Sequence, residues 1–254
     1  KKKLRDQGKI LLISAITQIV FLNFKEYAVI NCSVEIAKRL NLYPGIINAT
    51  LKKIAINKND LKQIKINFTD LPLWFQKKTH FMSDYEKKQF LENFHEEPNI
   101  HIVFKDEEKL KKFDAKILKT SMISGFLLDE KNFQEKISFI NGDWWVQDFS
   151  SFLPLYNFDK INKKKVFLDA CAAPGGKSFQ ILSKKLNVVL NDKNINRIQT
   201  LKTNLERLKL SAEIYNKDFI KFDNKKKFDV IIIDAPCSAV GTIRRNPEIF
   251  FKNK

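Results

Sequence analysis

The sequence predicts an α/β fold with a parallel sheet in its last third, preceded by a small α+β module and an all-helical first segment. Short apolar runs that suit strands alternate in the last third with helical patterns, and such alternation indicates a parallel, doubly wound sheet. The kinds of element that the sequence predicts change along the chain and divide it into residues 1–65, 66–160 and 161–254. We therefore expect three parts, the last of which carries an incomplete parallel sheet.

Residues 1–65 are predicted to be helical because apolar side chains recur there at intervals of three and four. The spacing holds over Ile10–Val20 and again over Ile46–Ala55. Pro44 and Gly45 interrupt the pattern, so we expect a new helix to begin at this point. Amphipathic helices that pack on one another account for the whole segment.

Residues 66–160 mix short elements of both kinds. Ile100–Phe104 alternates like a strand, Glu107–Phe113 is typical of a short helix, and Trp144–Gln147 is typical of another strand. This mixture predicts a small α+β module that links the other two parts or contacts RNA.

The formal charge of +17, from 46 Lys and Arg against 29 Asp and Glu, favours a polyanionic partner such as nucleic acid. Lys, Asn, Ile and Phe are all abundant, which an A+T-rich coding sequence would also produce, so the charge alone is a weak signal. Aromatic side chains could stack on bases, although burial in a core is their more common place. The three tryptophans to which this applies are Trp74, Trp144 and Trp145.

A strand, a tight loop of small residues and a helix follow one another around residue 170. Val166–Leu168 suit a buried strand, and Ala172–Gly176 carry so little side chain that a ligand can lie against the backbone. A helix that begins near Gly176 would direct free N–H groups at an anionic group in this loop. The arrangement predicts a site for a nucleotide or a related cofactor.

One alternative for this loop is a P-loop NTPase. Gly176-Lys177-Ser178 matches the end of a Walker A motif, and the apolar strand that leads to Asp234 could be its usual companion. The spacing G-x-x-x-x-G-K-[ST] requires a first glycine where this chain has Cys171. The missing glycine disfavours the NTPase and leaves it as the weaker alternative.

The other interpretation is a Rossmann-like site for a cofactor that carries a ribose. Such a site has an acid at the end of the next strand, and Asp192 closes the strand predicted over Val188–Asn191. The loop lacks the G-x-G-x-x-G pattern of dinucleotide sites, and S-adenosylmethionine fits it better. Asp218 follows a third predicted strand, 212–215, where an acid could bind the adenine amino group.

A fourth strand is predicted over Phe228–Ile233; it is apolar on both faces, and we expect both faces to be covered. Asp234 and Cys237 follow it. Because the carboxyl ends of parallel strands meet at one edge of a sheet, these side chains should face the same crevice as the loop 172–176. A thiolate that adds to carbon 6 and an acid at N3 activate carbon 5 of a pyrimidine toward a methyl donor.

Three motifs together resemble the RsmB (Sun/Fmu) family of 16S ribosomal RNA cytosine-5 methyltransferases. They are Asp169-Ala-Cys-Ala-Ala-Pro-Gly-Gly-Lys177, Asp234-Ala-Pro-Cys-Ser238 and Gly241-x-x-Arg-Arg-x-Pro-Glu248. Upstream, residues 44–51 are similar to a late helix of the NusB-like RNA-binding domain of that family, and residues 146–150 are similar to its V-Q-D-x-S lead into the catalytic domain. The resemblance extends over nearly the whole chain.

The resemblance implies roles for individual residues. Lys177, Arg244 and Arg245 would contact RNA, and Asp234 would also lie near the target base. Cys237 would release the product, while the nucleophile belongs to a later Thr-Cys-Ser motif that these 254 residues do not contain. An alternative makes Cys237 itself the nucleophile, as in DNA cytosine-5 enzymes. The residues implied to bind S-adenosylmethionine are Cys171, Ala172, Ala173, Pro174, Gly175, Gly176, Lys177, Asp192, Asp218 and Asp234.

The resemblance also predicts a chain truncated at both ends, with fewer strands than a complete sheet of this family. The strand 228–233 would then lie at an uncovered edge. We expect such a chain to bind the cofactor weakly without turnover. A non-catalytic RNA-binding remnant remains the alternative.

The sequence gives little support to a disulfide-rich, zinc-binding, secreted or membrane protein. Three scattered cysteines form neither a disulfide framework nor a zinc motif, which favours the reducing cytoplasm. No apolar run reaches the roughly 18 residues of a membrane span, and no secretion signal precedes the first motif. We expect a cytoplasmic monomer that binds 16S ribosomal RNA, without a metal and without a membrane. The histidines that form no ligand cluster are His80, His95 and His101.

Overall fold

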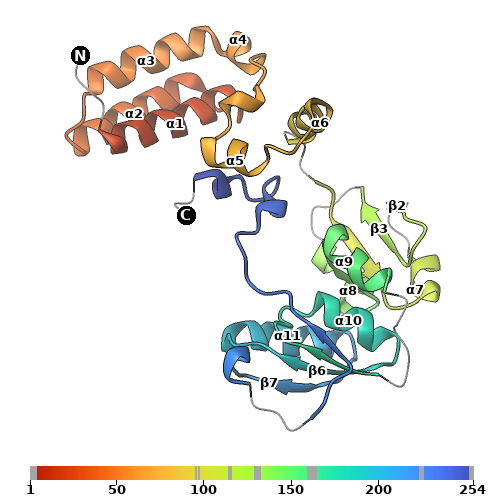
Figure 1. Ribbon diagram of the computed structural model, residues 1–254. Helices are drawn as coiled ribbons and strands as arrows, with labels where there is room; N and C mark the ends of the chain where they lie inside the picture. Colours follow the sequence, from red (N-terminus) through yellow and green to blue (C-terminus); the bar gives the residue numbers. More distant parts are fainter. Residues whose placement is uncertain are drawn as a thin grey trace. The chain divides into compact units, whose positions relative to one another are not determined.

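The computed structural model describes residues 5–94, 96, 98–113, 116–128, 133–158, 165–222 and 226–251. The chain forms two compact units, residues 1–91 and 92–254, which are drawn in Figure 1. The divisions predicted after residues 65 and 160 fall inside these units and stay predictions. His95 lies outside the described residues.

Helices make up the first unit, as predicted. α1 (Asp6–Val20), α2 (Glu26–Arg39) and α3 (Pro44–Ile56) lie side by side in Figure 1 and pack on one another, and α4 (Lys58–Lys62) follows. Pro44 occupies the first turn of α3, where its fixed φ suits a helix start. Shorter elements complete the unit: η1 (Phe68–Asp70), α5 (Leu73–Lys78) and the first part of α6 (Asp84–Phe94).

The buried face of α1 differs from the apolar spacing in the sequence. Ile10 and Ile13 are 67% and 64% exposed, whereas Ala15, Ile19 and Val20 are buried against α2 and α3. The period of the helix was predicted correctly. The side that faces the core is set by the neighbouring helices.

The second unit begins with an α+β module, which takes up only the later part of the range 66–160 predicted for it. Its antiparallel sheet has the order β2-β3-β1-β4 and buries Ile102, Phe104, Leu127 and Trp144 between the strands and their helices. The strands are β1 (His101–Phe104), β2 (Ile117–Lys119), β3 (Ser124–Leu127) and β4 (Trp144–Val146). The helical elements are α7 (Glu107–Lys111), η2 (Phe133–Glu135), α8 (Ile137–Ile140) and α9 (Phe149–Tyr156). Trp144 and Trp145 are buried, which excludes them from stacking on bases, while Trp74 is half-buried.

The predicted parallel sheet follows, with the order β7-β6-β5-β8 and every pair parallel. Figure 1 shows α10 and α11 covering one face of this sheet. The strands are β5 (Val166–Asp169), β6 (Asn187–Asn191), β7 (Glu213–Tyr215) and β8 (Val230–Ile232). The helical elements are α10 (Gly176–Ser183), α11 (Ile195–Arg207), η3 (Phe219–Lys221), η4 (Val240–Thr242) and η5 (Pro247–Phe251).

The strand β8 lies at one edge of the sheet. Ile231 is 50% and Ile233 61% exposed, so the expectation that both faces of this strand are covered was wrong. The physical reason is that no helix among the described residues connects η3 to β8 and packs over the outer face of that strand. The expectation of an uncovered edge was correct.

The α+β module and the parallel sheet share one hydrophobic core. Trp145 of β4 meets Phe179 of α10 edge to face, with ring centroids 5.8 Å apart. The Arg207 guanidinium lies 3.9 Å over the Phe139 ring and donates to the carbonyl oxygens of Phe139 and Trp144 at 2.6 and 3.1 Å. These contacts hold the module beside the helix that follows the loop 171–177.

Candidate cofactor and substrate site

The predicted site residues gather at the carboxyl ends of the four parallel strands. Strands β5, β6, β7 and β8 end at residues 169, 191, 215 and 232, and the residues that follow line two cavities. We call them the loop cavity, of about 240 Å³, and the strand-end cavity, of about 590 Å³. Cys171 lines both, so the two cavities adjoin.

Backbone hydrogen bonds to both neighbouring strands fix the start of the loop 171–177. Ala170 N–H donates to the Ile232 carbonyl and Ala172 N–H donates to the Asn191 carbonyl, both at 2.9 Å. Gly175 adopts a φ of +120°, and a Cβ added there would lie 2.0 Å from Cζ of Phe179. Gly175 lines neither cavity, so its visible role is to turn the chain into α10.

The loop cavity contains a buried acid and an ion pair. Asp169 is buried; its Oδ2 accepts a 2.7 Å hydrogen bond from Ser178, while Oδ1 has no hydrogen-bond partner among the described residues. Burial raises the pKa of the Asp169 carboxyl to about 6, against the opposing hydrogen bonds from Ser178 and the Cys171 backbone. At the rim, Lys177 Nζ pairs with Asp234 at 2.5 Å.

The strand-end cavity brings Asp192 and Asp218 together. Asp192 is buried and accepts hydrogen bonds from the backbone N–H groups of Ala173 and Asn194 at 3.2 and 2.9 Å. Asp218 pairs with Lys193 at 2.8 Å, and this hydrogen bond is the main cause that lowers the pKa of its carboxyl. Both acids stand where the sequence places them, at the ends of β6 and β7.

The two cysteines of the site lie in different surroundings. Burial, followed by the charges of Asp192 and Asp169, raises the pKa of the Cys171 thiol, so this thiol stays protonated at neutral pH. Cys237 is exposed; its Sγ accepts a hydrogen bond from the Ala239 N–H at 3.3 Å and lines neither cavity. The expected crevice therefore includes Asp234 at the loop cavity and Ala235 and Pro236 at the strand-end cavity, but not Cys237.

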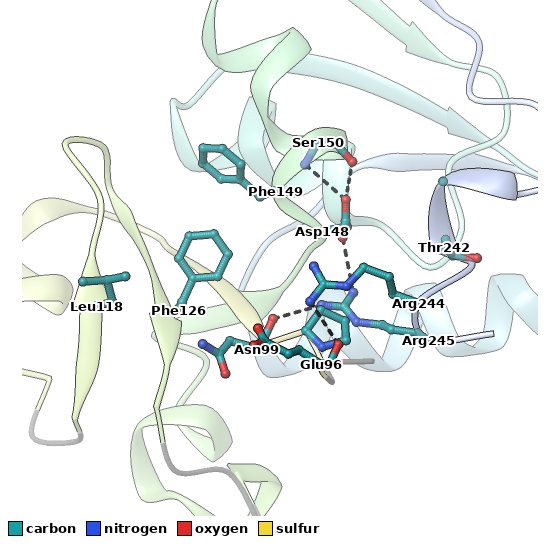
Figure 2. Close-up of a pocket in the computed structure, with 12 residues that line it drawn as sticks. Glu96, Asn99, Leu118, Phe126, Asp148, Phe149, Ser150, Thr242, Arg244 and Arg245 are labelled. Carbon is teal, nitrogen blue, oxygen red and sulfur yellow. Dashed lines mark hydrogen bonds and ion pairs between the residues drawn. The ribbon is translucent and has the colours of Figure 1, made fainter. Parts of the chain in front are cut away.

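The two arginines predicted to contact RNA are bound to the α+β module. Arg244 donates to the Glu96 carbonyl at 3.0 Å, and Arg245 donates to the Asn99 carbonyl at 3.0 Å and to Asp148 Oδ1 at 3.2 Å. Figure 2 shows these contacts on one side of a third cavity, of about 510 Å³. We call it the Arg–Phe cavity; besides the two arginines and Asp148 it is lined by Leu118, Phe126 and Phe149.

The described residues contain neither a metal-ligand cluster nor a membrane-spanning helix. No group of three or more His, Cys, Asp or Glu side chains is arranged to hold a metal ion. No helix in this part of the chain has the length and apolar character needed to cross a membrane.

Two family models match separate parts of the chain. Residues 158–254 match the family model "16S rRNA methyltransferase RsmB/F". This part of the chain is therefore similar to the methyltransferase domain of the RsmB/F family. Residues 1–56 match the NusB family, so the helical first part of the chain is similar to NusB proteins.

The relatives that this chain matches bear a common name. "Ribosomal RNA small subunit methyltransferase B" of Shewanella oneidensis is 41% identical over 95 residues, which make up 35% of this chain and 22% of that protein. Its namesake from Serratia proteamaculans is 27% identical over 259 residues, which cover 94% of this chain and 60% of that protein. The chain thus spans about 60% of the length of a relative that it matches almost throughout.

A solved structure supports the fold. The crystal structure of PH0851 matches with a TM-score of 0.73 at 20% identity, covering 97% of this chain and 61% of that one. At this identity the likeness concerns the fold alone.

The RsmB/F match replaces the P-loop alternative. The Ser178 hydroxyl, which a Walker A motif would turn toward a metal, is fully buried and donates to Asp169. Residues 158–254 include all the cofactor, catalytic and RNA residues predicted from the sequence.

One part of the site was not predicted from the sequence. Val146, Gln147, Asp148 and Ser151 of the α+β module line the loop cavity. The Gln147 amide accepts from Trp145 Nε1 at 3.0 Å and donates to Gln180 of α10 at 2.8 Å. The V-Q-D-x-S motif was the available signal, but its distance in sequence from residue 171 concealed its place in the cavity.

Proposed function

We propose that this chain forms the cofactor-binding part of a methyltransferase that transfers a methyl group from S-adenosylmethionine to carbon 5 of a cytosine in 16S ribosomal RNA. The observation that carries the proposal is the pair of adjoining cavities at the strand ends of an RsmB/F domain. One cavity contains Asp169, and the other contains Asp192 and Asp218.

The described residues fit this cofactor. The unpartnered Asp169 Oδ1 can accept from an ammonium group, and Asp192 and Asp218 retain lone pairs for ribose hydroxyls and an adenine amino group. A Cβ on Gly176 would lie 3.3 Å from Gln147, so glycine keeps the wall of the loop cavity open beside the first turn of α10. S-adenosylmethionine, when bound, supplies the electrophilic methyl group.

The chain's own residues position the base. Asp234 stands at the mouth of the loop cavity, where its carboxyl can hydrogen-bond the ring edge of a cytosine and stabilise charge on the ring. Lys177 holds Asp234 through their ion pair and supplies positive charge toward RNA phosphates. We assign Cys237 to release of the methylated base, and the nucleophile to the family's Thr-Cys-Ser motif.

Asp169→Asn tests the cofactor site. Asparagine keeps the shape of the side chain but removes the charge, so we expect the affinity for S-adenosylmethionine to fall at least about tenfold, the effect of losing one charged hydrogen bond. Equilibrium dialysis with labelled cofactor measures it. Asp84→Asn, at a fully exposed position in α6, is the matched control. Equal affinity of Asp169→Asn and the unchanged chain would refute the proposed site.

The methylated atom needs a second assay. We expect no turnover by the 254 residues alone and formation of 5-methylcytidine in 16S RNA by a fusion that supplies the Thr-Cys-Ser strands. Methyl on an exocyclic nitrogen would refute the carbon 5 assignment. A covalent adduct with 5-fluorocytosine RNA that persists after Cys237→Ala would exclude Cys237 as the nucleophile. RNA binding with no cofactor binding would favour the RNA-binding remnant.

A further inference from the structure

The Arg–Phe cavity has two chemically different sides. Figure 2 shows Leu118, Phe126 and Phe149 on one side and Asp148 with the two arginines on the other. At about 510 Å³ it has room for a nucleotide-sized group. Its lining includes Arg244 and Arg245, which the family resemblance implies contact RNA, but the methyl transfer proposed above gives the cavity itself no role.

The aromatic side offers rings to a planar ligand. The centroids of Phe126 and Phe149 are 5.5 Å apart with a tilt of 52°, and both side chains are only partly buried. Leu118 beside them is 60% exposed. Unstacked RNA bases are commonly bound on such phenyl rings.

The polar side offers donors and acceptors in balance. The lining includes two basic residues, Arg244 and Arg245, and two acidic residues, Glu96 and Asp148, so the formal charges of the lining cancel. Each arginine uses only part of its five N–H donors, and Nε of Arg244 is buried without a partner in the described part of the chain. Because a phosphate would favour a net positive site, this neutral set suits a base edge, which both donates and accepts.

The Arg–Phe cavity lies next to the loop cavity. Asp148 lines both the Arg–Phe cavity and the loop cavity, so the two cavities adjoin at this residue. Asp148 is held there by Ser150 on one oxygen and by Arg245 on the other. A ligand in the Arg–Phe cavity is therefore a neighbour of whatever enters the loop cavity.

We propose that the Arg–Phe cavity binds an unpaired RNA base close in the strand to the base that enters the loop cavity. The inference rests on the proposed function for the identity of the RNA. It adds a specificity subsite built from the α+β module and the segment 241–245, with phenyl rings for stacking and arginine and aspartate groups for the base edge.

The test compares aromatic with aliphatic side chains at position 149. We expect Phe149→Leu to weaken binding of an unpaired 16S RNA fragment about 5- to 150-fold, the loss of one stacked base, and Phe149→Tyr to restore it. Phe251→Leu, at an exposed phenylalanine outside the cavity, is the matched control. Fluorescence anisotropy measures the affinity. Equal binding by the Leu, Tyr and unchanged proteins would overturn the proposal.

Salt dependence and photo-cross-linking supply independent readouts. Because the subsite is neutral, Phe149→Leu should leave the slope of log K against log salt unchanged, and a smaller slope would show a phosphate contact and overturn the assignment to a base. RNA carrying 5-iodouridine should cross-link to peptides that contain Phe126 or Phe149, even if Phe149→Leu fails to fold; cross-links confined to other peptides would also overturn it. If cofactor binding fails while these cross-links form, the proposed methyltransferase is wrong and the base subsite stands.

Discussion

The loop 171–177 and the segment 234–245 carry the two most specific motifs of the chain, yet the structure holds them in different ways. The loop follows a central strand and is bonded on both sides to neighbouring strands. The segment follows the edge strand β8, leaves Cys237 exposed and is held through Arg244 and Arg245 by distant backbone groups. A motif beside a central strand is thus shaped locally, whereas a motif beyond an edge strand depends on remote partners.

The largest expected effect is at Gly175. Alanine there would combine a positive φ with a Cβ 2.0 Å from the Phe179 ring, so we expect Gly175→Ala to lower the free energy of unfolding by about 3 kcal/mol or more. Gly241→Ala, in the other segment, meets no atom within 4 Å and should change it by less than about 0.5 kcal/mol. Urea unfolding measures both, and similar effects of the two substitutions would contradict the comparison.

The next effect concerns pH and the acid beneath the loop. The folded pKa of Asp169, about 6, lies above the unfolded value of about 3.9, so the folded chain binds this proton more tightly. Its ionisation as the pH rises from about 4 to above 6 then costs up to about 3 kcal/mol of stability. Asp169→Asn should exceed the unchanged chain in stability at pH 7.5 and match it below pH 4. Denaturant unfolding measures the stability of both proteins at each pH. If the difference in stability between them did not change with pH, the raised pKa of Asp169 would be contradicted.

The smallest expected effect on stability is that of the ion pair between Arg245 and Asp148, which holds the segment 234–245. Arg245 and Asp148 are 37% and 44% exposed, and solvent screens such pairs, so we expect a coupling energy of about 0.5 kcal/mol. A double-mutant cycle of Arg245→Gln and Asp148→Asn, followed by urea unfolding, measures the coupling. A value above about 2 kcal/mol would show that the segment is held as firmly as the loop.

The sequence was sufficient for the strand, loop and helix around residue 170, because buried apolar runs and small residues encode these locally. The parallel pairing of the strands and the positions of the acids after them followed from the same pattern. Residue type alone did not decide which apolar residues are covered: Ile13 and Ile231 look like core residues in the sequence and are exposed. Their environment depends on which neighbours pack there.

Long-range contacts account for the remaining differences. Arg244 and its partner Glu96 are separated by 148 positions, so no spacing rule could pair them. Gln147 reaches the loop cavity only because Trp145 packs on α10. Cys237 was expected in the crevice on the ground of strand topology, but in the irregular segment that follows β8 its side chain is exposed.

The shared interior of the antiparallel and parallel sheets has a practical consequence for dissecting the protein. Trp145 and Phe152 on one side and Phe179 and Leu201 on the other belong to a single cluster of buried side chains. Cutting the chain near residue 160, by proteolysis or by expressing the two parts separately, would expose apolar side chains of both parts to water. The second unit should therefore melt as one cooperative body, and a binding pocket made from both sheets would disappear in that same step.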